Sequence, residues 1–262
     1  MKYGLIETIN CLPCNAGVYF FYDERDELIY IGKSANIKKR VQQHFSGKDL
    51  KSLKIQLFTK RIACEVMGSE LIALLYESEL IKKHPPIYNR SQRRTVYQYG
   101  LYKQDVNGYK GLIIEKVQSD KKEITSFSTL KEAKTALFHI TEKHQLCQKI
   151  NGLYKSSSSC FQYQIKECNG ACISKKSTVD YNLRVDEFLS KITIKKFTRL
   201  FEVPGRTKDE IGLVYIENGV YKGFGFCLNT TKSESKLTFI QPFQDNKDVR
   251  RILIRHLIVE TS

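Results

Sequence analysis

Residues 16–45 read AGVYFFYDERDELIYIGKSANIKKRVQQHF, and this stretch decides the fold of the N-terminal part of the chain. Its segments 16–23 and 27–33 are rich in β-branched and aromatic side chains and are separated by a short charged turn. This pattern predicts a β-hairpin. If only two residues form the loop, Tyr19 and Tyr30 lie directly opposite each other, whereas a longer loop shifts that pairing.

The residues after the hairpin change to a helical period. Three apolar side chains recur on one helix face: Ile37, Val41 and Phe45. Arg40 and His44 are four residues apart beside this stripe, so their side chains would project from neighbouring positions. We therefore predict a helix that begins after Asn36 and ends at Gly47, since glycine favours helix termination.

A third strand and a second helix are predicted next. Residues 57–66 (LFTKRIACEV) have the composition of a strand. Gly68-Ser69 then begins a helix that continues to about Lys83. His84-Pro85-Pro86 ends this helix, because a residue before proline disfavours the helical conformation.

Glu77 is out of place on this second helix. Its neighbours at helical spacing are apolar: Ala73, Leu74, Leu80 and Ile81. A buried and unpaired carboxylate is costly, so it normally binds a cation or changes its protonation state. The alternatives are a partly exposed glutamate at the edge of the stripe, or a glutamate paired with Lys or Arg. Periodicity alone leaves these interpretations open.

The rest of the chain predicts a basic linker and smaller elements. The linker is residues 89–95 (NRSQRRT). The expected strands are 96–102, 111–117 and 124–129, and the expected helices are about 130–146, 180–191 and 248–258. Asn218-Gly219 between two apolar runs predicts a hairpin near the C-terminal end.

The chain is strongly basic, with 43 Lys and Arg against 28 Asp and Glu and a net charge of +15. The densest stretch, Lys33 to Arg61, has nine basic side chains opposed only by Asp49. Such a field attracts polyanions, and nucleic acid is the expected partner. A solvated, lysine-rich surface is the alternative. Apolar runs stay well short of the ~20 residues of a membrane span, and the N-terminus lacks a signal-peptide pattern. We expect a soluble, cytoplasmic protein.

Five elements in order along residues 16–89 resemble the signature of the GIY-YIG nuclease family. They are Ala16-Gly17-Val18-Tyr19, Tyr30-Ile31-Gly32-Lys33, Arg40 with His44-Phe45, the helix containing Glu77, and Asn89. The pattern is similar in particular to the N-terminal half of the C component of the bacterial ABC excinuclease and to Cho-type endonucleases. The GIY-YIG region fused to some proofreading exonucleases is also similar. His44 is a departure, because the excinuclease relatives usually have tyrosine there.

The resemblance implies an α+β fold, with a three-stranded antiparallel sheet flanked by helices, and one divalent metal ion that assists phosphodiester cleavage. Glu77 would be the only carboxylate ligand of Mg²⁺ or Mn²⁺, a role that suits an ion that keeps several waters. Tyr19 or Tyr30 would help to activate water, with Tyr19 the preferred base. A tyrosine pKa near 10 makes this demanding, because about one phenol in a thousand is ionised at pH 7.

The remaining site residues have roles implied by the same resemblance. Lys33 and Arg40 would supply the positive charge that favours a phenolate, and Arg40 would also clamp the scissile phosphate with its fork of donors. His44 would donate to a phosphate or relay a proton. Asn89 would orient the water bound to the metal ion, or the end of the strand.

Eight cysteines in a chain without a signal sequence indicate metal ligands, reactive thiols or core residues in place of disulfides. Four gather in one segment: Cys147, Cys160, Cys168 and Cys172. Only the last pair has the tight spacing of a zinc knuckle, whereas four thiolates at looser spacing suit a [4Fe–4S] cluster. The segment resembles the cysteine-rich region after the nuclease domain of the same excinuclease component. An iron–sulfur cluster is expected, and zinc or metal-free core thiols are the alternatives.

The other four cysteines are expected to have no metal. Cys11 and Cys14 form an isolated CxxC without a second pair to complete a zinc site. Cys64 and Cys227 fall in predicted strands and are expected in the core.

These patterns predict four domains: a GIY-YIG nuclease domain over 1–95, a small α+β domain over 96–146, a cysteine-rich region over 147–175, and a helix with a β-rich module over 176–262. The expected function is metal-dependent DNA nicking, directed by structure or damage, in nucleotide excision repair, leaving 5′-phosphate and 3′-hydroxyl ends. The alternative is a non-catalytic DNA-binding accessory. Damage-recognition proteins of excision repair, or a proofreading exonuclease, are the expected protein partners.

Overall fold

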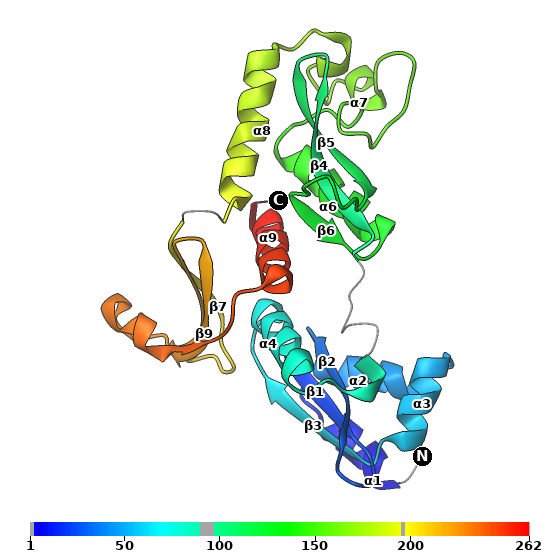
Figure 1. Ribbon diagram of the computed structural model, residues 1–262, viewed down its shortest axis with the longest axis vertical. Coiled ribbons are helices and arrows are strands. Elements are labelled where there is room, and N and C mark those ends of the chain that lie inside the picture. Colours follow the sequence, from blue (N-terminus) through cyan, green and yellow to red (C-terminus); the bar gives the residue numbers. More distant parts are fainter. Residues whose placement is uncertain (1–2, 90–96, 195–196, 262) are drawn as a thin grey trace. The chain divides into compact units, whose positions relative to one another are not determined.

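The computed structural model describes residues 3–89, 97–194 and 197–261 (Figure 1). By its internal contacts the chain divides into two compact units. The first unit comprises Met1–Arg94 and Ile194–Ile252, and the second comprises Thr95–Thr193 and Leu253–Ser262. The expected division into four domains stays a prediction. Apart from Asn89, the predicted linker lies outside the described residues.

The first unit contains the predicted three-stranded sheet. Its antiparallel strands have the order β2-β1-β3, with the bounds Gly17–Tyr22 for β1, Leu28–Ser34 for β2 and Arg61–Val66 for β3. Helix α2 (Ile37–Ser46) follows the hairpin, and α4 (Glu70–Lys83) follows β3 and packs on β1 and β2. The short 3₁₀ turn η1 (Ile87–Asn89) lies against β2. This arrangement confirms the α+β fold expected for this part of the chain (Figure 1).

The hairpin loop is longer than two residues, so Tyr19 and Tyr30 are not directly opposed, and the pairing is shifted as expected for a longer loop. Asp23 begins the loop, and its Oδ1 accepts hydrogen bonds from the backbone N–H groups of Arg25 and Glu27 at 2.9 Å each. A further register shift between Phe21 and Tyr22 adds to the longer loop, so Tyr30 pairs with Phe21 and Tyr19 pairs with Gly32. The carboxylate at the start of the loop offers the backbone a local alternative to the strand ladder, which is why the loop widens.

Two helices were missed by the sequence patterns: α1 (Tyr3–Cys11) and α3 (Leu50–Phe58). The predicted third strand was therefore too long, because residues 57 and 58 end α3 and the strand begins only at Arg61. Only Ser52 and Ile55 of α3 are buried. With so little apolar surface facing the core, the helix shows no stripe for a periodicity argument to detect. Its N-cap Asp49 was the available signal.

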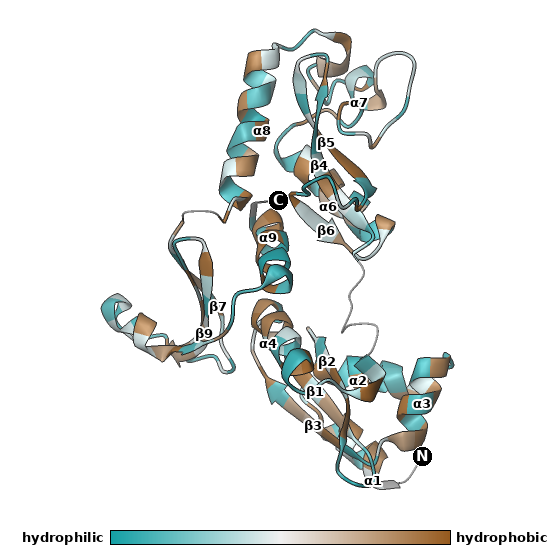
Figure 2. Ribbon diagram, viewed as in Figure 1, coloured by the Kyte–Doolittle hydropathy of each residue, from teal (hydrophilic) through white to brown (hydrophobic). Residues whose placement is uncertain are grey.

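The helices that were predicted have clear caps and apolar faces. The Asn36 side chain accepts the Lys39 N–H at the start of α2, and the Ser69 hydroxyl accepts the Ile72 N–H at the start of α4. The α2 stripe joins a core formed with α1, β1 and α3, and its buried members are Ile37, Val41 and Phe45. Figure 2 shows the apolar colouring concentrated on these strands and on one side of the helices.

A second sheet completes the first unit. Its order is β10-β9-β8-β7, with β7 Arg199–Pro204, β8 Glu210–Glu217, β9 Val220–Leu228 and β10 Ile240–Pro242; the 3₁₀ helix η3 (Ser233–Phe239) precedes β10. The predicted Asn218-Gly219 hairpin is confirmed, with both residues at positive φ. Phe224 of β9 packs on Tyr76 of α4, with ring centroids 5.8 Å apart.

The second unit is a smaller α+β body. Its sheet has the order β5-β4-β6, with β4 Tyr99–Val106, β5 Tyr109–Lys116 and β6 Thr125–Phe127. The helices are α6 (Leu130–Lys143), the short α7 (Phe161–Gln164) and α8 (Thr178–Ile192), with the 3₁₀ turn η2 at Ala171–Ile173. The three strands, α6 and α8 agree with the predicted elements, except that β4 and β5 extend to meet at an Asn107-Gly108 turn. The short α7 and η2 were also missed by the sequence patterns.

Helix α9 (Lys247–Thr261) begins in the first unit and ends in the second, close to the predicted final helix. None of the helices in the described ranges is both long and apolar enough to cross a bilayer.

Candidate active site and cysteine cluster

Tyr19 and His44 are in direct contact. The Tyr19 hydroxyl oxygen lies 2.8 Å from His44 Nε2, a hydrogen bond between two buried side chains. Tyr19 comes from β1, and His44 comes from the last turn of α2, on the side of the helix that faces the sheet. Gly32 of β2 makes room for the phenol, because a Cβ atom there would lie 2.3 Å from the Tyr19 hydroxyl oxygen. The glycine is thus required by the tyrosine opposite it.

Tyr30 belongs to the same cluster although it does not face Tyr19 directly. The ring centroids of Tyr19 and Tyr30 are 6.0 Å apart, and those of Tyr30 and His44 are 5.2 Å apart. Phe21, which the sequence patterns did not single out, touches all three rings at 5.3 to 5.6 Å. Tyr19 and Tyr30 are thus diagonal neighbours on one sheet face, and His44 of α2 converges on them.

Glu77 and Asn89 both bind the free edge of β2. A Glu77 carboxylate oxygen accepts the backbone N–H of Lys33 at 3.0 Å. The Asn89 side chain accepts the Ile31 N–H at 2.8 Å and donates to the Ile31 carbonyl at 2.7 Å. Both side chains are buried, with exposed fractions of 8% and 0%. The interpretation of Glu77 as a partly exposed residue at the edge of the stripe is therefore wrong.

The cations take different positions around this cluster. The Lys33 ammonium forms an ion pair with Glu70, at the start of α4. Arg40 is exposed and donates to Gln43 at 3.0 Å. Lys51, in the helix that was missed, places its ammonium 4.5 Å from the centroid of the Tyr30 ring. Arg40 and Lys51, and not Lys33, are thus the cations near the rings.

Burial sets the protonation states of the ring groups. It raises the pKa of Tyr19 well above 10, Tyr30 raises it further, and Arg40 opposes the shift. Burial followed by the charge of Glu77 raises the pKa of Tyr30 to about 12. Burial, with the positive charges of Arg40 and Lys51, lowers the pKa of His44 to about 4. At neutral pH the two tyrosines are phenols and His44 is a neutral imidazole that can accept a proton.

The donors here suit a hard divalent cation. The buried Glu77 carboxylate and the two phenol oxygens are oxygen groups, which Mg²⁺ and Mn²⁺ prefer. Mg²⁺ commonly keeps several waters and needs only one or two carboxylates. The residues present therefore fit such an ion at Glu77.

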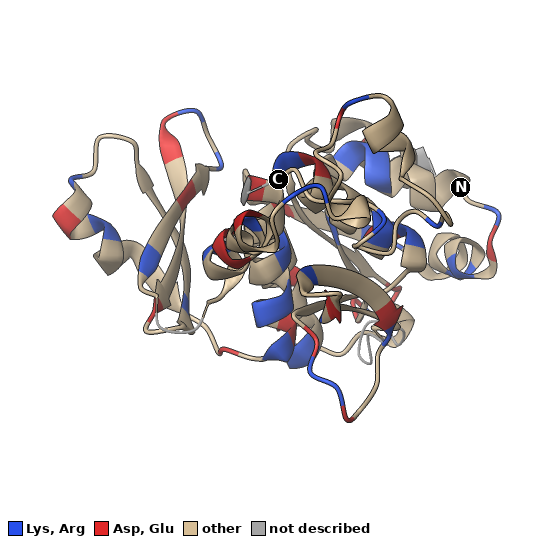
Figure 3. Cartoon of the chain, turned by 90° about the horizontal axis from the view of Figure 1, so that it is seen from above, with Lys and Arg blue, Asp and Glu red and all other residues tan. Residues whose placement is uncertain are grey.

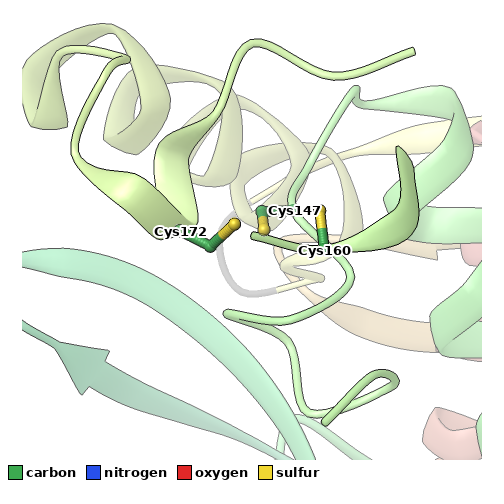
Figure 4. Close-up of side chains that lie close together, drawn as sticks. All are labelled: Cys147, Cys160 and Cys172. Carbon is green, nitrogen blue, oxygen red and sulfur yellow. The ribbon is translucent and has the colours of Figure 1, made fainter. Parts of the chain in front are cut away.

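The second unit brings the four clustered cysteines together. The sulfurs of Cys147, Cys160 and Cys172 all lie within 4.8 Å of one another (Figure 4). Cys168 joins them, with its sulfur 3.7 Å from that of Cys160. These residues come from the irregular segments before α7 and around η2, so loops in place of regular elements position the thiols.

Neighbouring residues fix the positions of these cysteines and give their thiols different pKa values. Tyr181 of α8 accepts hydrogen bonds from the Cys147 N–H and from Asn151 Nδ2, which also donates to the Cys147 carbonyl. Burial raises the pKa of Cys147 to about 12. Against burial, the Tyr163 N–H and the other three thiols lower the pKa of Cys160. The Cys160 thiol therefore ionises more easily than an ordinary thiol, and a bound metal ion would favour ionisation of the others.

Two of the other cysteines, Cys64 and Cys227, lie in strands as expected. Cys227 is buried in β9, and Cys64 is half-buried against the core of the first unit. Cys11 and Cys14 are exposed, and neither joins a metal-sized group within the described residues.

Two family models match this chain. Residues 15–90 match the UvrC-like GIY-YIG domain, and residues 97–191 match the middle domain of UvrC/Cho excinucleases. Residues 15–90 thus belong to the GIY-YIG family. This GIY-YIG domain contains the Tyr19–Tyr30–His44 cluster and Glu77, and the middle domain contains the four clustered cysteines.

Two relatives are similar to about 70% of this chain. Excinuclease cho of Escherichia coli O6:H1 is 32% identical over 193 residues, which are 71% of this chain and 64% of that protein. UvrABC system protein C of Aster yellows witches'-broom phytoplasma is 30% identical over 187 residues, or 70% of this chain and 31% of that protein. The chain thus spans less than two thirds of the length of these relatives.

Solved structures match over the GIY-YIG domain. The GIY-YIG N-terminal endonuclease domain of UvrC from Thermotoga maritima, bound to magnesium as its catalytic divalent cation, is 30% identical, with a TM-score of 0.32. The match covers 34% of this chain and 99% of that chain.

Proposed function

We propose that the protein is a metal-dependent DNA endonuclease that nicks one strand in nucleotide excision repair. The observation that carries this proposal is the buried carboxylate of Glu77 on the free edge of β2, in the domain where two tyrosines and a histidine converge. The relatives named excinuclease and UvrABC system protein C support the repair context.

The proposed chemistry begins at the Tyr19–His44 hydrogen bond. A metal ion held by Glu77 would supply positive charge to the phosphoryl oxygens and to the leaving 3′ oxygen. The Tyr19 hydroxyl would donate its hydrogen bond to His44 Nε2, which is unprotonated at neutral pH. Burial raises the pKa of Tyr19, so positive charge from the bound metal ion and from Arg40 would be needed to favour loss of the Tyr19 proton to solvent. The Tyr19 oxygen then takes a proton from the attacking water, whose oxygen bonds to phosphorus as the P–O3′ bond breaks. The 3′ oxygen is protonated by solvent, leaving 5′-phosphate and 3′-hydroxyl ends.

The other site residues position the reacting groups in this proposal. Arg40 is exposed at the edge of the cluster and would bind the scissile phosphate with two parallel hydrogen bonds. Tyr30 keeps a phenol beside Tyr19 and would hydrogen-bond the attacking water. Lys33 fixes the start of α4 through Glu70, and Asn89 holds β2 in register.

Basic residues provide the attraction for DNA. The stretch from Lys33 to Arg61 includes α2 and α3, which flank the site. Figure 3 shows blue segments on the helices near the N-terminus of the chain. A duplex that passes this surface would place a phosphate at Arg40, and affinity would fall steeply with salt.

We also propose that the four clustered cysteines bind a [4Fe–4S] cluster. Four sulfurs gathered from loops supply the ligands that such a cluster needs. Its position in the middle domain suggests a role in stability or DNA binding and not in hydrolysis. Zinc is the competing occupant, because a tetrahedral Cys₄ site has the same ligands.

A nicking assay tests the enzymatic proposal. Supercoiled plasmid carrying bulky lesions should be nicked in Mg²⁺ and left intact in EDTA, and Glu77→Gln should lose activity by at least about 100-fold because its ligand charge is gone. Glu79→Gln, on the same helix, is the matched control and should keep wild-type activity.

The alternative functions give different results in the same preparation. DNA affinity without cleavage by the intact protein, in Mg²⁺ and in Mn²⁺, would contradict the endonuclease and support a DNA-binding accessory. Co-purification with polymerase subunits would support an accessory of a replicative proofreading exonuclease, whereas association with damage-recognition proteins would support excision repair.

A further inference from the structure

Lys51 lies at the active-site cluster although no sequence motif includes it. It is in the first turn of α3, where the N-cap Asp49 accepts its backbone N–H at 3.1 Å. The ammonium lies 4.5 Å from the centroid of the Tyr30 ring on β2. Lys51 therefore reaches the cluster from the capped start of α3.

The charge of Lys51 has no acidic partner at close range. Among the residues that the structure describes, no carboxylate oxygen lies within 4.0 Å of its ammonium, whereas Lys33 in the same unit is paired with Glu70. Lys51 is half-buried. Burial lowers the pKa of Lys51 and Arg40 lowers it further, whereas the more distant carboxylates of Glu77 and Asp49 oppose this. A partly desolvated cation without a counter-ion favours an anionic ligand.

Arg40 and Lys51 approach the same rings from two helices. Both charges lower the pKa of His44, with Arg40 on α2 and Lys51 on α3. Arg40 is exposed, so it can reach outward, whereas Lys51 lies deeper, over Tyr30. Two cations at different depths beside the proposed base could hold one phosphate group by two of its oxygens.

We infer that Lys51 binds the non-bridging oxygen of the DNA phosphate that is cut, as a second cation beside Arg40. This inference rests on the proposed endonuclease function and adds a substrate-binding residue to it. The cation–π contact with Tyr30 holds the ammonium in place before DNA binds, and the phosphate then supplies the missing counter-charge.

Substitutions that separate charge from packing test this role. Lys51→Met keeps an unbranched side chain over Tyr30 and removes the charge, and Lys51→Arg restores the charge. Under single-turnover conditions, Lys51→Met should lower the cleavage rate roughly 10- to 100-fold, and Lys51→Arg should recover most of it. Lys83→Met is the matched control, because Lys83 is exposed at the end of α4. It should cleave within about twofold of wild type.

Equilibrium binding gives a second readout that a purely structural role would not change. The slope of log affinity against log salt should fall by about one for Lys51→Met, with an unchanged urea unfolding midpoint. Wild-type cleavage and salt slope in Lys51→Met would overturn the inference while leaving the endonuclease intact. If the wild-type protein bound DNA without cutting it, the proposed function would fail, and the salt slope would still decide whether Lys51 contacts phosphate.

Discussion

His44 is the residue whose surroundings change its chemistry most. Its side chain lies beside Tyr19 with an exposed fraction of 6%. Two cations act on it, Arg40 from α2 and Lys51 from α3. A tyrosine at this position, as excinuclease relatives usually have, could give or receive a hydrogen bond but would be a poor proton acceptor at neutral pH. The neutral imidazole is a hydrogen-bond acceptor for the Tyr19 hydroxyl, so the departure from the family pattern is compatible with activity.

The lowered pKa of His44 predicts a loss of stability in acid. The unfolded chain binds a proton at a pKa of 6.5, whereas the folded protein binds it at about 4. Between these values the unfolded state holds more protons, so the free energy of unfolding should fall as the pH drops from about 6.5 to 4, by up to about 3 kcal/mol. Urea unfolding in EDTA over this range measures it.

His44→Gln is the control for this pH dependence. The variant should be less stable at pH 7, because it loses the bond to Tyr19, but its stability should decline less between pH 6.5 and 4. An equal decline in both proteins would show that other groups cause the loss.

At the scale of elements, the free edge of β2 explains why α4 and η1 are part of the site. An edge strand leaves every second backbone N–H without a strand partner. Asn89 satisfies the one at Ile31, and Glu77 satisfies the one at Lys33. The two residues, 12 apart in sequence, therefore meet neighbouring positions of one strand. Pro85-Pro86 follows the end of α4 and lets the chain turn back toward β2, where Asn89 binds.

Loss of the Asn89 side chain should destabilise the edge of β2. Asn89→Ala leaves a buried N–H and a buried carbonyl of Ile31 without this partner, so the free energy of unfolding should fall by about 2 to 3 kcal/mol. Asn89→Asp keeps the acceptor and loses the donor, and should cost less at pH 7. Urea unfolding followed by circular dichroism checks both variants.

Metal dependence separates this structural role from an effect on the active-site water. The loss in Asn89→Ala should be the same in EDTA and in Mg²⁺. A loss that appears only in Mg²⁺ would instead assign Asn89 to metal binding.

At the scale of the whole molecule, each unit has its own candidate metal centre. The first unit offers oxygen donors at Glu77, and the second offers four sulfurs. Hard divalent ions prefer the first set, and zinc or iron prefers the second. Removal of one metal should therefore leave the other in place.

The sulfur site should control the stability of the second unit. Cys160→Ser should remove the bound metal and lower the thermal midpoint of the protein, since metal-binding free energy contributes to folding. Cys11→Ser is the control, because Cys11 is exposed and outside the cluster. Metal analysis and visible absorption of the purified protein measure occupancy. Broad visible absorption with iron supports the [4Fe–4S] proposal, whereas a colourless protein with stoichiometric zinc contradicts it.

The sequence by itself determined the hairpin, α2 and α4, because their caps and apolar stripes are local signals. The sequence also identified the four cysteines as one group of candidate metal ligands, and it placed Glu77 on an apolar helix face. Only the tertiary structure decided that Tyr30 pairs with Phe21, that the Tyr19 hydroxyl meets His44, and that Lys51 lies over Tyr30. These contacts depend on loop length and on a helix with few buried side chains, and neither leaves a periodic pattern in the chain.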